Sequence, residues 1–104
     1  MSEHALSYGA MIPQEELSVE KMAELLNVDS SRVLDTLVES HTIVGDNDFV
    51  EMLYNPDEEM VYVLHGMMVN ESTGQPTSGT LKKVIDHLGY TGSIGFIVLS
   101  FDNE

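Results

Sequence analysis

Residues 18–40 read SVEKMAELLNVDSSRVLDTLVES, and this segment carries the strongest structural signal in the chain. Apolar residues recur at helical spacing on both sides of a short polar stretch, which is the pattern of two amphipathic helices joined by a turn. Pro13 or Ser18 begins the first helix, because proline suits a first helical position and serine caps an N-terminus. Asn27 ends it. The apolar positions are Val19, Met22, Ala23, Leu25 and Leu26 in the first helix and Val33, Leu34, Leu37 and Val38 in the second.

Several residues of this segment occupy positions that matter where two helices cross. Ala23 is small enough for a helix crossing, Val28 fills the turn, and Ser30 opens the second helix. Val33 and Leu37 then pack back on the first helix. In these positions the segment resembles a helix-turn-helix, and more closely the small N-terminal helical module of bacterial initiation factor 2. The resemblance implies a unit of two crossing helices.

The same unit is poorly suited to reading DNA. Asn27 stands where the helix-turn-helix pattern usually has a glycine. A recognition helix needs hydrogen-bond donors for phosphates and purine edges, but here one arginine stands among three carboxylates. A structural or protein-binding role is therefore favoured. The exposed positions of the second helix are Asp29, Ser31, Arg32, Asp35 and Glu39.

Downstream of these helices the apolar pattern changes to that of strands. Residues 49–54 and 60–69 flank a turn at residues 55–58, where a proline suits the second position of a type I turn. Residues 81–88 have the spacing of a helix that a glycine ends, and residues 94–101 form a last strand. The strand at 60–69 is apolar on both faces, which indicates a central position. If the last two strands pair in parallel, a right-handed crossover joins them.

These elements predict an α+β fold in a single domain, residues 1–104. Residues 1–12 are expected to form a flexible arm, residues 13–44 the helical part with two N-terminal helices, and residues 49–104 a ββαβ part. The ββαβ part consists of a β-hairpin, a third helix and a final strand. It is expected to form a small three-stranded sheet with the helix across it.

The charge balance excludes several classes of function. The 104 residues hold 18 Asp and Glu against four Lys and Arg, for a net charge of −14, and they hold no cysteine. Binding to nucleic acid or to an anionic membrane depends on basic side chains, so we expect neither. Disulfides and thiolate metal sites are excluded as well. The N-terminal residues lack the pattern of a signal peptide, so we expect a cytoplasmic protein.

Like-charged residues stand four apart on both predicted N-terminal helices, Glu20 with Glu24 and Asp35 with Glu39. Each such pair costs about 0.2–0.5 kcal/mol in an isolated helix. Two interpretations stay open: a solvated face that keeps the protein in solution, or a surface that imitates the regular charges of a nucleic acid. On the second interpretation, the predicted partner-binding residues are Glu16, Glu20, Glu24, Asp35, Glu39, Asp46, Asp48, Asp57, Glu58 and Glu59.

The sequence shows no pattern of a catalytic or metal site. His41, His65 and His87 are the candidates for a zinc site, but their spacings do not match a metal-binding pattern. Residues 74–82, GQPTSGTLK, differ from a phosphate-binding loop because two residues separate the second glycine from the lysine. No serine or carboxylate stands at the spacing of a catalytic group. We therefore predict no enzymatic activity, no cofactor and no metal.

These observations favour a protein that binds a basic or nucleic-acid-binding protein and inhibits or modulates it, as a DNA mimic would. In composition only, the chain resembles small acidic phage inhibitors of host enzymes, a resemblance that would imply action in the host cytoplasm. The alternative is a helix-turn-helix type transcriptional or translational regulator or adaptor that acts through protein–protein contacts. Strands that are apolar on both faces leave a homodimer open.

Overall fold

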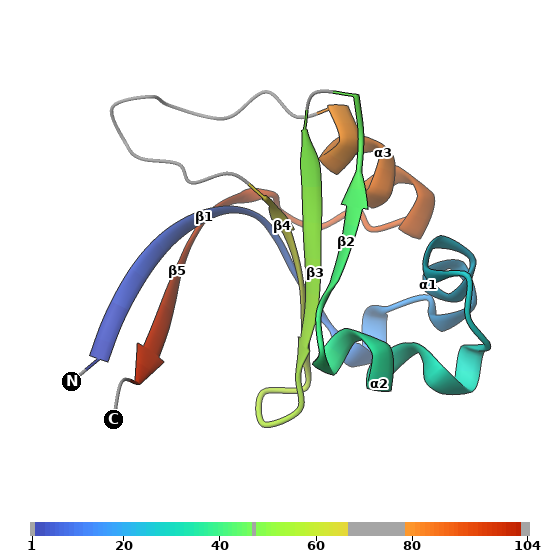
Figure 1. Ribbon diagram of the computed structural model, residues 1–104, viewed down its shortest axis with the longest axis horizontal. Coiled ribbons are helices and arrows are strands. Elements are labelled where there is room, and N and C mark those ends of the chain that lie inside the picture. Colours follow the sequence, from blue (N-terminus) through green and yellow to red (C-terminus); the bar gives the residue numbers. More distant parts are fainter. Residues whose placement is uncertain (1, 47, 67–78, 103–104) are drawn as a thin grey trace.

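The computed structural model describes residues 2–46, 48–66 and 79–102. In this part of the chain, five antiparallel strands form one sheet in the order β2-β3-β4-β1-β5. Helices pack on one of its faces (Figure 1). The strands are β1 (Ser2–Pro13), β2 (His41–Val44), β3 (Phe49–Asn55), β4 (Met60–His65) and β5 (Gly95–Asp102). The helices are α1 (Val19–Leu26), α2 (Val33–Val38) and α3 (Gly79–Leu88), with short 3-10 helices η1 (Gln14–Glu16) and η2 (Ser30–Arg32).

The α+β class is confirmed, but the prediction of a three-stranded sheet is wrong. Residues 1–12 were predicted as a flexible arm, whereas β1 occupies a place inside the sheet between β4 and β5. Tyr8, Ala10 and Ile12 alternate along β1 and are buried in the core, so the strand is held by both its ladders and its side chains. β2 is a second unpredicted strand, and it follows directly after the helices at the edge of the sheet.

The strands predicted at residues 60–69 and 94–101 do not pair with each other, so the condition for a right-handed crossover between them is not met. β5 pairs antiparallel with β1, from Gly9 opposite Gly95 to Ser2 opposite Asp102, and β1 separates it from β4. No right-handed crossover therefore links β4 and β5. The predicted hairpin is present, because β3 and β4 pair antiparallel around the turn at residues 56–59. β4 lies third in the sheet order, as its two apolar faces predicted.

The helical part begins and ends at residues that the sequence predicted, namely Ser18, Asn27 and Ser30. Pro13 ends β1, and α1 begins later, with the Ser18 hydroxyl accepting the backbone N–H of Lys21 at 3.4 Å. Asn27 ends α1 in the left-handed conformation, with φ 56° and ψ 48°. Ser30 begins η2, so the second predicted helix consists of a 3-10 turn followed by the six residues of α2.

The core lies between the sheet and the helices. Leu37 of α2 and Met22 of α1 are fully buried, together with Val50 and Met52 of β3. Ala23 is buried as the predicted helix crossing requires, whereas Val28 in the turn is partly buried against this core. The other fully buried side chains are Ile12, Val33, Val61 and Val63.

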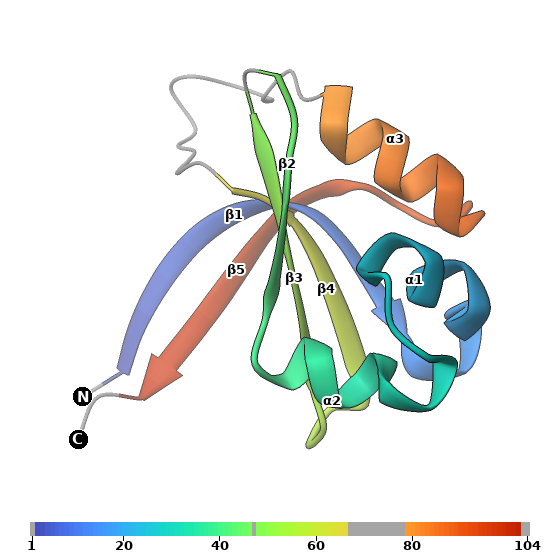
Figure 2. The same ribbon diagram turned by 45° about the vertical axis from the view of Figure 1, so that its right-hand side comes forward.

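The first half of β1 and most of β5 form a two-stranded ribbon, residues 2–8 with residues 96–102. β4 pairs with β1 only from Gly9 to Pro13, whereas β5 pairs with it from Ser2 to Gly9. The ribbon therefore projects beyond the helix-covered part of the sheet, with its two strands side by side to their ends (Figures 1 and 2). Gly9 lies where β1 passes from one neighbour to the other, and a Cβ there would collide with the backbone of Val63. Within the described residues, no helix is long and apolar enough to cross a membrane.

Candidate functional site

The structure separates the acidic residues that the sequence grouped as one surface. Asp46 and Asp48 lie at the end of the sheet where α3 begins, whereas residues 57–59 form the turn at the other end of β3. The seven residues of β3 span roughly 23 Å at about 3.3 Å per residue. Glu16 belongs to η1 and is followed by two residues outside any helix, so it does not extend the α1 pair as a row on one helix. The ten predicted partner-binding residues therefore do not form one continuous surface.

The first group borders an open hollow between α1 and η2. The hollow has a volume of about 660 Å³. Its lining includes three acidic residues, Glu20 and Glu24 of α1 and Asp29 at the start of η2, and one basic residue, Arg32. All four side chains belong to exposed residues. Three exposed acidic residues therefore border the hollow around the turn between α1 and η2.

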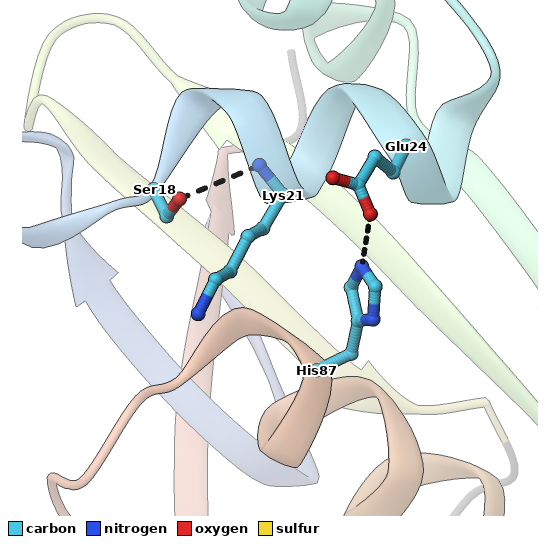
Figure 3. A network of polar contacts seen from close by, with 4 residues as sticks. All are labelled: Ser18, Lys21, Glu24 and His87. Carbon is cyan, nitrogen blue, oxygen red and sulfur yellow. Dashed lines mark hydrogen bonds and ion pairs between the residues drawn. The ribbon is translucent and has the colours of Figure 1, made fainter.

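Glu24 also links α1 to α3. Its Oε2 lies 3.4 Å from Nε2 of His87, and Figure 3 shows the two side chains pointing toward each other across the gap between the helices. Both side chains are solvent-accessible, with 67% of the Glu24 side chain and 39% of the His87 side chain exposed. Solvent screens an ion pair of this kind, so its contribution to stability is small. Glu24 remains accessible to a partner.

Asp35 and Glu39 lie on the other helix of the unit. Asp35 is in the first turn of α2, and Glu39 is the residue that directly follows the helix. Both are exposed. Only Asp35 therefore lies within α2, whereas Glu20 and Glu24 both lie within α1.

Asp48 has a structural role at the N-terminus of α3. Its carboxylate accepts the backbone N–H of Thr80 at 3.3 Å and also the Thr80 hydroxyl. A carboxylate at this position satisfies a helix N–H and lies at the positive end of the helix dipole. Asp48 also lines a groove of about 640 Å³ with Asp46, Lys83 and His87. Asp48 was predicted as a partner-binding residue, and its hydrogen bonds with Thr80 show that it caps α3.

Glu58 likewise has a structural role, in the β3–β4 turn. It accepts hydrogen bonds from the hydroxyl of Tyr62 at 2.5 Å and from Nδ2 of Asn55 at 3.0 Å. Burial, followed by the hydrogen bond to Glu58 and the charge of Glu58, raises the pKa of Tyr62 to about 12. Asp57 and Glu59 of the same turn are exposed. The turn is therefore organised by its own polar contacts.

Few cations balance these carboxylates. Lys82 pairs with Asp86 at 3.7 Å on the exposed side of α3, and Lys21 extends toward the end of α3 (Figure 3). Among the described residues, Glu20, Asp35 and Glu39 have no ion-pair partner. The helical carboxylates, defined here as Glu20, Glu24, Asp35 and Glu39, are therefore an exposed and largely unneutralised set.

The structure brings together no metal-binding or catalytic cluster within residues 2–46, 48–66 and 79–102. No group of three or more His, Asp or Glu there has the arrangement of a metal site. His41 lies on β2 and His65 on β4, with β3 between them, and His87 lies on α3. The loop segment 74–78 of the phosphate-loop comparison lies outside the described residues.

Sequence reasoning missed one surface, the outer part of β5. Phe96 and Val98 have 46% and 65% of their surface exposed although both are large apolar residues, and Ile94 beside them has 40% exposed. The available signal was the two-sided apolar pattern of residues 94–101. That pattern left a homodimer interface open without locating it, and β5 forms an edge of the described sheet.

Comparisons of the chain with protein-family models, curated protein sequences and solved structures find no significant match. The resemblance of residues 18–40 to the initiation factor 2 module stays a prediction. So does the compositional resemblance to phage inhibitors. Function is therefore inferred from the geometry and charge of the chain itself.

Proposed function

We propose that this chain is a non-enzymatic acidic protein that binds a basic surface of another protein, such as a nucleic-acid-binding cleft, and inhibits or modulates that protein. The observation that carries the proposal is the set of helical carboxylates, which are exposed and have few cations beside them. A negative surface of this kind attracts basic clefts and accelerates association by electrostatic steering. Action in a host cytoplasm, as a phage product, is the setting that the composition favours.

The proposed contact surface is the α1–η2–α2 unit. Asp48 and Glu58 are engaged in hydrogen bonds within the fold, so the presence of a carboxylate at these two positions has a structural explanation. Among the described residues, Glu20, Asp35 and Glu39 have no such contact, and a like-charge pair such as Glu20 and Glu24 costs about 0.2–0.5 kcal/mol in an isolated helix. Four residues of helix advance about 6 Å, so Glu20 and Glu24 space two charges along one side of α1. An unfavourable pairing on an exposed unit supports a binding role.

The test compares two variants with equal net charge. The helical variant carries Glu20→Gln, Glu24→Gln, Asp35→Asn and Glu39→Gln. The control carries Glu15→Gln, Glu51→Gln, Asp57→Asn and Glu59→Gln, which are exposed residues outside α1 and α2. Both variants should remain folded, because exposed substitutions usually change stability by less than about 0.5 kcal/mol each.

Binding is measured by capturing partners from a cell lysate at low and high salt, identifying them, and determining their affinities as purified proteins. We expect a nucleic-acid-binding protein that is retained by the wild type and the control, is lost by the helical variant, and is released at high salt. Equal losses with both variants would contradict a defined site. A captured regulator whose binding changes neither with salt nor with the helical substitutions would favour the alternative, a helix-turn-helix type regulator or adaptor.

A further inference from the structure

In the sheet of described strands, β5 has an unpaired outer edge. In the described part of the chain, β5 pairs with β1 on one side, and no strand pairs with its other side. Natural proteins protect such edges with short strands, charged residues, proline or bulges, because a free edge templates pairing with another strand. β5 is eight residues long, and its first seven residues, GFIVLSF, include neither a charge nor a proline.

The opposite edge of the sheet, formed by β2, has the features that protect a strand edge. β2 has only four residues, and Asp46 follows it after a single glycine. A short strand with a nearby carboxylate is the kind of protection that edges normally have. β5 lacks this protection, so its open edge requires an explanation that β2 does not.

The ribbon of β1 and β5 is also the least supported part of the sheet. An isolated two-stranded ribbon is marginally stable in water, and independent stability needs further strands or a packed face. Phe96 contacts Tyr8 edge-to-face with ring centroids 5.2 Å apart, but it keeps almost half of its surface exposed. Val98, one pleat farther out, is more exposed still. The ribbon therefore has apolar surface and backbone groups that a further strand would cover.

The distribution of charge on the chain indicates which strand would pair with the open edge of β5. The chain carries a net charge of −14, so a second copy is repelled from the acidic helices and turns. Residues 94–101 are uncharged, and they lie at the opposite edge of the sheet from the acidic β2–β3 turn. Two copies can therefore meet there over the exposed apolar residues Ile94, Phe96 and Val98 without bringing carboxylates into direct opposition.

We propose that β5 pairs antiparallel with β5 of a second copy around a two-fold axis, joining the two sheets into one. A strand edge placed against its own copy in this way is self-complementary, as an isologous two-fold interface must be. Directly opposed residues of antiparallel strands point to the same face, so the apolar side chains of the two copies lie next to each other on a shared face. The register that pairs most of the strand is centred on Val98 or on Leu99. This dimer is independent of the proposed binding function.

The first test measures mass in solution. We expect the wild type to approach twice the 11.5 kDa of the chain as its concentration rises, in sedimentation or light scattering. Val98→Lys places a charge on the open edge and should return the protein to the monomer. Val44→Lys is the matched control, since Val44 is 78% exposed on β2, and it should leave the dimer unchanged. Circular dichroism checks that both variants are folded.

The second test uses the absence of cysteine from the chain. Val98→Cys and Leu99→Cys are oxidised separately, and the residue at the centre of the register should give a disulfide-linked dimer, because its Cβ atoms lie within disulfide range. Val44→Cys should remain monomeric. The proposal is overturned by a wild type that stays monomeric up to concentrations of about 0.5 mM, far above the dissociation constant of a specific interface. It is equally overturned by a dimer that survives Val98→Lys and forms no crosslink at residue 98 or 99.

Discussion

Asn27 explains how the helical unit forms without the glycine that usually occupies such a turn. Its φ of 56° and ψ of 48° lie in the left-handed region, which most side chains avoid because Cβ approaches the following carbonyl. Asparagine is the residue after glycine that adopts this conformation most often at a helix end. Val28 can then donate its backbone N–H to Ala23 at 3.2 Å, which closes the end of α1. The departure from the glycine pattern therefore leaves the packing of the unit intact.

Leu37 tests whether α2 packs as described. The side chain is fully buried, so Leu37→Ala should destabilise the protein by about 2–5 kcal/mol through lost burial and the resulting cavity. The neighbouring residue Val38 is 52% exposed, and Val38→Ala should change the stability by less than about 0.5 kcal/mol. Urea unfolding of the three proteins measures both effects. Equal midpoints for Leu37→Ala and the wild type would show that this face of α2 is assigned wrongly.

Tyr62 makes a prediction about alkaline pH. Its pKa is raised from 10.0 to about 12 in the folded protein, first by burial and then by Glu58. The unfolded chain therefore loses this proton at lower pH than the folded protein does, so the stabilisation is complete below pH 10 and is lost as the pH rises toward 12. Tyr62→Phe removes this dependence.

Unfolding free energies measured from pH 8 upward provide the check. The difference between the wild type and Tyr62→Phe should be constant below pH 10 and should shrink between pH 10 and about 12. The difference in tyrosinate absorbance between the wild type and Tyr62→Phe isolates the titration of Tyr62 from that of the other tyrosines. Parallel curves for the two proteins across that interval would mean that Tyr62 has an ordinary pKa.

At the level of elements, the helices were predictable and part of the sheet was not. α1 and α3 have a 3.6-residue apolar period with a recognisable cap or glycine at an end, and these are local signals. β1 has an equally local alternation, Leu6, Tyr8, Ala10 and Ile12, but the small residues Gly9 and Ala10 and the apolar Met11 make it irregular. β2 has four residues, which is too short for any period to show. The pairing of β5 with β1 spans almost the whole chain, so no local pattern encodes it.

The candidate site was predictable only in its residue types. The sequence shows which side chains are acidic, but β3 places the two acidic turns at opposite ends of the sheet. The same tertiary contacts decide that Asp48 caps α3 and that Glu58 binds Tyr62. Glu20, Glu24, Asp35 and Glu39 are exposed, as expected for polar positions of amphipathic helices, because the local apolar period of each helix determines which of its residues face the core.

The cap of α3 gives a prediction at this scale. Asp48→Ala removes the acceptor for Thr80 and should cost about 0.5–2 kcal/mol, with faster hydrogen exchange in the first turn of α3. Asp46→Ala is the control, because Asp46 is exposed and carries the same charge. It should leave both quantities nearly unchanged. If the two substitutions have equal effects, the contribution of Asp48 is general electrostatics and not capping.

For the molecule as a whole, the charge distribution predicts no affinity for nucleic acid. The four Lys and Arg are divided between α3, with Lys82 and Lys83, and the α1–η2 region, with Lys21 and Arg32. Neither pair forms a basic patch, and DNA binding requires several cations that displace counterions. Fluorescence anisotropy with duplex and single-stranded DNA should show no binding at about 0.15 M salt. Saturable binding at micromolar protein would overturn the charge argument and favour the regulator.

The register of the ribbon also determines how the protein responds to mechanical force. Ser2 lies opposite Asp102, so a load applied between these two residues pulls β1 and β5 apart at the tip of the ribbon. Antiparallel hydrogen bonds lie perpendicular to the strands, so this load reaches them one after another, as in opening a zipper, and not all at once as in shear. The ribbon should peel at low force up to Gly9, where β4 joins β1 and the helix-covered sheet begins to share the load. Under tension the protein would thus lengthen in two stages, and the first would leave the core intact.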